Sequence, residues 1–166
     1  APNGPITNAV RACAFGEQAV KCGRVLPCPG AKQGGQMVRT VKDMMAEANT
    51  LVERIGVEAA RRKIAQGALV LDVRDAPEVE NQGKVAGSLH VSRGMLEFRA
   101  DPDTPYHDKA FQKDRTILVY CASGGRSALS GKLLKEMGYE NVYNLGGFKD
   151  WVEAGGDVEH PVDKGM

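Results

Sequence analysis

The sequence predicts an α/β fold in which a central parallel sheet carries helices on both faces. Short runs rich in leucine and β-branched residues alternate along the chain with segments of helical periodicity. The chain has 166 residues, which is enough to bury a core without disulfides or a metal. We expect one domain over residues 37–160, an N-terminal leader over 1–36 and a C-terminal tail over 161–166.

The leader is rich in proline, glycine and cysteine, and its apolar residues follow neither helical nor strand spacing. We expect it to lie outside the fold, as an upstream extension before an internal start at Met37, a remnant of expression or a flexible tail. Three of the four cysteines, Cys13, Cys22 and Cys28, are spaced irregularly here. The spacing favours neither a disulfide framework nor a metal site, and we expect a reducing compartment.

Two helices are predicted first. The stretch 41–52 has apolar residues at helical spacing, with Thr40 as N-cap and Asp43 three positions later. A second helix covers 57–64, preceded by Gly56 and ended by Gly67.

The run 68–73 predicts a strand buried on both faces, with Asp72 and Arg74 at the carboxyl edge of the sheet. A short helix from Pro77 to about Gly83, a brief strand over 88–91 and a helical turn over 95–99 follow. The proline-containing stretch 101–108 predicts a surface loop.

The strand 116–120 is followed by a glycine-containing loop and a helix that ends at Gly138. The helix should begin near Arg126 and turn its large apolar residues inward. A last strand at 142–143 and a final helix after Gly146-Gly147 complete the pattern. The expected inward residues of the helix after the loop are Leu129, Leu133, Leu134 and Met137.

Cys121 is expected to be the first residue past the most apolar strand, where parallel sheets bind ligands. The residues after it are small enough for successive backbone N–H groups to turn inward and form an anion-binding nest. The start of the next helix and the Arg126 guanidinium both favour the thiolate, so we expect a lowered pKa for Cys121. These loop residues are Ala122, Ser123, Gly124, Gly125 and Ser127.

A thiolate in such a nest can take a sulfur atom from a donor, and the same amides would stabilise the resulting persulfide in a two-step cycle. Cysteine-dependent phosphatases place five residues between nucleophile and arginine, whereas four separate Cys121 from Arg126. The shorter ring suits one extra sulfur atom better than a phosphate. A phosphatase or arsenate enzyme remains an alternative, tested with p-nitrophenyl phosphate.

The segment 121–127 resembles the active-site loop of the rhodanese family, the single-domain thiosulfate sulfurtransferases and their relatives. The stretch 72–78 resembles the family's first strand motif, and 83–88 resembles its glycine turn. The stretch 138–151 resembles its closing segment. The four matches stand in the family's order over about residues 55–155.

This resemblance implies a rhodanese fold in which Cys121 forms the persulfide and Arg126 orients an oxyanion such as thiosulfate. Cyanide or a thiol, a protein thiol included, would accept the sulfur. Asp72 and Arg74 would pair near the base of the site and support the loop. Lys84 departs from the family, which has histidine at this position.

Several residues have a structural interpretation beside a functional one. Ser123 and Ser127 are expected to cap backbone groups as readily as to contact sulfur. We expect structural roles for His90 and His107 rather than a pairing with the cysteine. Two further pairs of residues are open to the same question. Arg93 and Arg99 could attract an anionic donor or be merely solvated, and Phe148 and Trp151 are expected in the core.

The charge balance, 22 basic against 21 acidic residues, argues against nucleic acid and membrane surfaces as partners. No apolar run approaches the length of a spanning helix, and we expect a cytoplasmic protein. The predicted activity requires no cofactor and no metal. A non-catalytic binding or regulatory module with the same fold is the alternative.

Overall fold

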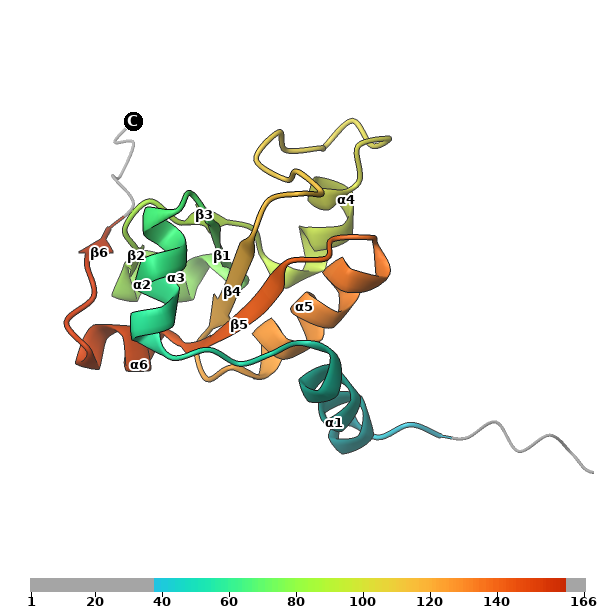
Figure 1. Cartoon of the computed structure of the whole chain (residues 1–166), viewed down its shortest axis with the longest axis horizontal. Helices are drawn as coiled ribbons and strands as arrows, with labels where there is room; N and C mark the ends of the chain where they lie inside the picture. The colour runs from blue at the N-terminus through green and yellow to red at the C-terminus, as the bar shows by residue number, and fades with distance from the viewer. Residues whose placement is uncertain (1–37, 161–166) are drawn as a thin grey trace, which may run out of the picture. The chain divides into compact units, whose positions relative to one another are not determined.

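The computed structural model describes residues 38–160. The centre of this part is a four-stranded parallel sheet with strand order β3-β1-β4-β5 (Figure 1). This confirms the predicted α/β class with a parallel sheet. The strands are β1 (Leu69–Asp72), β3 (Leu89–His90), β4 (Ile117–Cys121) and β5 (Val142–Gly147).

Helices cover both faces of this sheet, as predicted (Figure 1). Alternate residues of β1 and β4 point to opposite faces, so the core has two parts. Leu71 and Val119 face the side of α4 and α5. Val70 and Leu118 face the side of α2 and α6. The helices are α1 (Val41–Leu51), α2 (Val57–Ala65), α3 (Ala76–Gln82), α4 (Leu96–Ala100), which follows the 3-10 turn η1 (Arg93–Met95), α5 (Gly125–Glu136) and α6 (Phe148–Glu153).

Helix α1 begins where the sequence predicted. Thr40 is its N-cap, and the side chains of Thr40 and Asp43 form a reciprocal capping box. The helix packs on α5, with Ala48 fully buried. α5 is therefore enclosed between the sheet and α1.

The buried face of α5 differs from the expected leucine stripe. Leu134 is fully buried, but Leu133 is only partly so. Because α5 has neighbours on two sides, small residues fill most of its buried positions. A Cβ at Gly131 would lie 2.8 Å from Val52 Cγ1, which shows how closely the two segments approach. The buried residues of α5 are Ser127, Ala128, Ser130, Gly131 and Leu134.

One strand pair was not predicted, and one expectation about the strands is corrected. β2 (Lys84–Val85) and β6 (Val158–Glu159) form a separate antiparallel pair that the sequence pattern did not indicate. Both strands have only two residues, too few for a period to be recognised. Cys121 is the last residue of β4, not the first residue beyond it, because it still pairs with Gly147 of β5.

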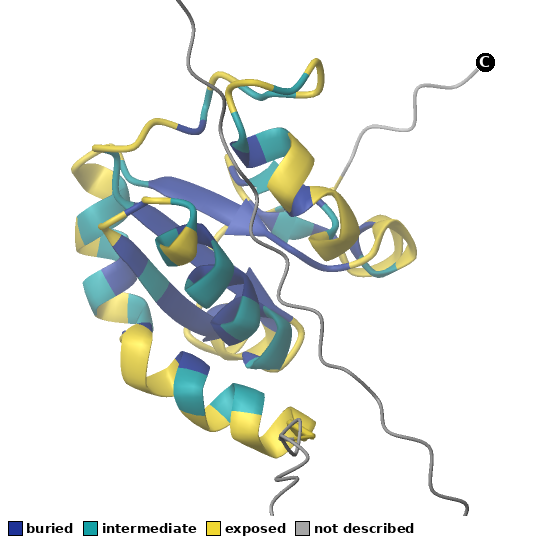
Figure 2. Cartoon of the chain, turned by 90° about the vertical axis from the view of Figure 1, so that its right-hand side faces the viewer, coloured by how far each residue is buried: buried dark blue, intermediate teal, exposed yellow. Residues whose placement is uncertain are grey.

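Strands β1 and β4 and most of β5 are buried, whereas the outer faces of the helices are exposed (Figure 2). No helix within 38–160 is long and apolar enough to span a membrane. The predictions for the leader, its three cysteines and the tail 161–166 concern residues outside the described part.

Candidate active site

Cys121 stands at the carboxyl end of β4, between the ends of β1 and β5. Its side chain is 1% exposed. The backbone N–H of Gly124 donates to Sγ at 3.1 Å, and the Ser127 hydroxyl lies 3.7 Å from the same atom. Gly124 has a φ of +98°, a conformation that favours glycine, and it caps α5. The chain thus curls around the sulfur before the helix begins.

These contacts determine the charge state of the thiol. Burial alone raises the pKa of Cys121, but hydrogen bonds outweigh it. The donors are the backbone N–H groups of Ser127, Ser123 and Gly124, and the side-chain contact with Ser127 lowers the pKa of Cys121 further. The pKa of Cys121 is therefore lowered, and the site favours a thiolate.

The loop is fastened from the side of β5 by Asn144, which is 2% exposed. Its amide nitrogen donates to the Gly124 carbonyl at 3.2 Å. Its Oδ1 accepts from the Ser127 hydroxyl at 2.7 Å and from the Gly146 N–H at 2.9 Å. Asn144 was not among the predicted site residues, although a polar residue two positions before a Gly-Gly pair was a usable signal.

Arg126 is held by two carboxylates on the side of α3. Its Nη1 and Nη2 lie 2.6 and 2.8 Å from the two oxygens of Glu78, and Nη1 lies 3.3 Å from Asp75. The hydrogen bond from Arg126 lowers the pKa of Glu78 to about 2. The guanidinium is about one-third exposed and forms a bidentate pair.

Asp72 and Arg74 form an ion pair at the end of β1, and both side chains are fully buried. Arg74 Nη2 lies 2.7 Å from Asp72 Oδ2 and also donates to the Gly83 carbonyl at 2.6 Å. The hydroxyl of Tyr120 donates to the same Asp72 oxygen at 2.6 Å. The pair thus joins the end of β1 to the residue before the cysteine and to the turn before β2.

Lys84, which stands in place of the family's histidine, faces the last strand. Its ammonium group pairs with Glu159 of β6 and donates to the Ser88 carbonyl. The second oxygen of Glu159 accepts from the Gly87 N–H at 3.2 Å. Lys84 therefore fastens β6 against the turn that follows β2.

The side chains of the remaining candidate residues make no hydrogen bond to Cys121 within residues 38–160. His90 Nε2 is 2.9 Å from the Arg74 carbonyl, and no hydrogen bond joins it or His107 to Cys121 in the described part. Ser123 is exposed. Phe148 and Trp151 are 7% and 5% exposed, in the core as expected.

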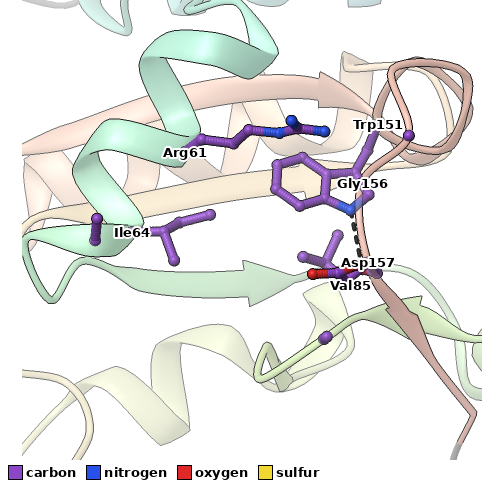
Figure 3. A pocket seen from close by; sticks show the side chains of 9 residues that line it. Arg61, Ile64, Val85, Trp151, Gly156 and Asp157 are labelled. Carbon is purple, nitrogen blue, oxygen red and sulfur yellow. Dashed lines mark hydrogen bonds between the residues drawn. The ribbon is translucent and has the colours of Figure 1, made fainter.

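Trp151 borders a concavity of about 500 Å³ between α2 and the segment that follows α6 (Figure 3). Its Nε1 donates to the Asp157 carbonyl at 3.0 Å. No residue of 121–127 lines this concavity. Two other pockets adjoin the loop 121–127, one lined by Ala122 and the other by Arg126.

The structure defines a class of α/β proteins in which a cysteine ends a central parallel strand and accepts hydrogen bonds from N–H groups of the turn that begins the next helix. The family model of the rhodanese-like domain matches residues 56–154. The chain belongs to the rhodanese-like family. Helix α1 precedes the matched region.

The similar proteins include curated sulfurtransferases. Thiosulfate sulfurtransferase GlpE of Coxiella burnetii is 36% identical over 84 residues, which cover 50% of this chain and 70% of the relative. Thiosulfate sulfurtransferase PspE of Escherichia coli is 35% identical over 80 residues, covering 48% and 70%. These relatives support sulfur transfer as the general activity.

Among solved structures, a Rhodopseudomonas palustris protein of unknown function, described as a possible tyrosine phosphatase, has a TM-score of 0.68. It is 40% identical, and the match covers 74% of this chain and 96% of that one. The polysulfide-sulfur transferase of Wolinella succinogenes has a TM-score of 0.59 at 27% identity, covering 75% and 90%. Both share the fold described above.

Proposed function

We propose that this protein moves a sulfane sulfur from thiosulfate or a related donor to a thiol or cyanide through a persulfide on Cys121. The observation that carries the proposal is the ring of N–H groups around a buried sulfur, with Gly124 N at 3.1 Å. These donors favour a negative charge on sulfur, which is the state a nucleophile needs.

The cycle has two balanced steps. The Cys121 thiolate attacks the outer sulfur of thiosulfate, a new S–S bond forms, and sulfite leaves with the electron pair of the old bond. The acceptor then attacks the outer sulfur of the persulfide and releases the thiolate. Cyanide yields thiocyanate, and a thiol yields a new persulfide. The same N–H groups stabilise the anion in both states.

The resemblance to the rhodanese family implies that Arg126 orients the sulfur donor. Its guanidinium is engaged by Glu78 and Asp75, so a direct contact with the donor stays a prediction. The positive charge of the Arg126 guanidinium still favours the thiolate form of Cys121. A cytoplasmic location likewise stays a prediction.

The test is the intact mass of the protein after brief exposure to thiosulfate. A gain of one sulfur atom is expected, followed by its loss as thiocyanate when cyanide is added. Cys121→Ser should abolish both while its circular dichroism stays that of the wild type. Retained transfer in this variant would show that the nucleophile is misassigned.

The same preparation tests the phosphatase alternative. We expect no hydrolysis of p-nitrophenyl phosphate by protein that transfers sulfur. Hydrolysis that depends on Cys121, without any gain of sulfur, would instead assign phosphate chemistry to the site. Absence of both activities would leave the non-catalytic module as the function.

A further inference from the structure

The pocket that adjoins Arg126 is large enough for more than the transferred sulfur atom. We call it the mouth pocket. Its volume is about 620 Å³, within the range of small-ligand sites. It is lined by Asp75, Arg93, Gly94, Glu97, Phe98 and Arg126.

The fold brings Arg93 to this pocket from a distant part of the sequence. β3, β1 and β4 are parallel neighbours, so the segments that follow them emerge at one edge of the sheet. η1 follows β3, as the catalytic loop follows β4. Leu96, directly after η1, belongs to the same buried cluster as Cys121. Arg93 therefore lies beside the loop and lines the same pocket as Arg126.

The two arginines of the mouth pocket, Arg93 and Arg126, differ in whether a carboxylate is paired with them. Both Nη atoms of Arg126 are within 2.8 Å of Glu78, and one also contacts Asp75. Arg93 is exposed, and no carboxylate within 38–160 forms an ion pair with it. An external anion could bind Arg93 without displacing a carboxylate, whereas at Arg126 it would compete with two.

Two carboxylates line the pocket, and one of them, Asp75, is already paired with Arg126. Glu97 lies one turn of chain beyond Arg93, is exposed, and lines the same pocket. Phe98 gives an apolar wall and is 48% exposed. The pocket thus offers a cation and a surface for an organic group, with a carboxylate that disfavours excess negative charge.

We propose that Arg93 binds the anionic end of the sulfur donor and that Glu97 opposes it, so the two residues set the donor's charge preference. This inference rests on the proposed sulfur transfer for its biological meaning. The donor class is an anion, sulfonate-like or carboxylate-bearing, whose sulfane sulfur reaches Cys121. The planar guanidinium suits either group because it donates two parallel hydrogen bonds.

The experiment compares two alkylating probes of similar size, anionic iodoacetate and neutral iodoacetamide, on the full chain. The rate at Cys121 is followed by mass spectrometry of its peptide, which separates it from the leader cysteines. Arg93→Ala should lower the iodoacetate rate about tenfold and leave the iodoacetamide rate unchanged. Glu97→Gln should raise the iodoacetate rate about twofold.

Arg99→Ala is the matched control, because it also removes one positive charge, here from the neighbouring helix α4. Arg99 lines a different pocket and contacts Asp108 and the Tyr106 carbonyl. Its ratio of the two rates should equal that of the wild type. Equal ratios in Arg93→Ala and wild type, or equal losses in the two arginine variants, would overturn the proposal.

Alkylation requires no sulfur transfer, so this result stands even if the proposed function fails. If thiosulfate does load Cys121, Arg93→Ala should also raise KM for thiosulfate about tenfold with kcat nearly unchanged. An unchanged KM would count against donor binding at Arg93.

Discussion

The hydroxyl of Ser127 donates to the side-chain oxygen of Asn144 at 2.7 Å, which joins the first turn of α5 to the strand β5. Both residues are buried. The same Asn144 oxygen accepts from the Gly146 N–H, and its amide group donates to the Gly124 carbonyl. One side chain therefore fixes the two segments between which the thiol lies.

Asn144→Ala is expected to destabilise the position of the loop 121–127. It leaves the Gly124 carbonyl, the Gly146 N–H and the Ser127 hydroxyl without this partner, and an unsatisfied buried group costs about 1–3 kcal/mol. We expect the free energy of unfolding in urea to fall by about 2–4 kcal/mol and sulfur transfer to fall with it. Asn144→Asp keeps the acceptor oxygen but removes the donor to Gly124, so an intermediate loss is expected. Wild-type stability of Asn144→Ala would contradict this role.

The lowered pKa of Cys121 predicts that its alkylation by iodoacetamide increases at lower pH than for an ordinary thiol, whose pKa is about 8.5. Ser127→Ala removes the side-chain contact that lowers the pKa of Cys121, so the pH midpoint should shift upward. Ser123→Ala is the control, because Ser123 contributes only its backbone N–H. The measurement is the alkylation rate at Cys121 as a function of pH. A midpoint that moves equally in both variants would argue against the hydroxyl contact.

The pair of Glu78 and Arg126 predicts a difference in acid stability. Because the folded protein lowers the pKa of Glu78 to about 2, its contribution is complete above the unfolded value of about 4.3. It is lost as the pH falls from there through about 2. Between pH 5 and pH 3 the wild type should therefore lose more stability than Glu78→Gln.

The difference for Glu78→Gln should be about 1 kcal/mol, because the pair is partly exposed to solvent. The measurement is the urea midpoint of both proteins at the two pH values. Other carboxylates titrate in both proteins and cancel in the comparison. Parallel pH dependence would show that this ion pair contributes nothing to folding.

The features predictable from sequence were those with a local pattern. The helix start at Thr40 follows from a capping box that residues three positions apart complete. The anion nest around Cys121 follows from adjacent small residues and the helix after them. In both cases the interacting groups are within a few positions of each other.

The features that were missed depend on distant partners. The strand expected at 142–143 stopped short of Asn144, and asparagine gives no local signal for a strand. β5 in fact continues to Gly147, with a register shift opposite Val119 and Tyr120 that accommodates the extra residue. The pairing of Arg126 with Glu78 spans 48 positions and has no local signature. The length of β5 and the partner of Arg126 both depend on tertiary contacts.

Asp72→Asn tests whether the buried pair with Arg74 supports the site. The guanidinium would remain fully buried without a counter-charge, and breaking such a pair typically costs about 3–5 kcal/mol. Tyr120→Phe is the matched variant, since it removes only the hydroxyl that donates to Asp72 and accepts from the Val85 N–H. Its cost should be smaller, about 1–3 kcal/mol.

Both losses are measured by urea unfolding, and the alkylation rate of Cys121 is compared under native conditions. Tyr120, which donates to Asp72, directly precedes Cys121. If the ion pair fixes the position of Cys121, Asp72→Asn should also slow its alkylation. An Asp72→Asn protein as stable as the wild type would mean that Arg74 is retained by its other contacts. Those contacts are the carbonyl of Gly83 and the ring of Phe148, whose centroid lies 4.1 Å from the guanidinium carbon.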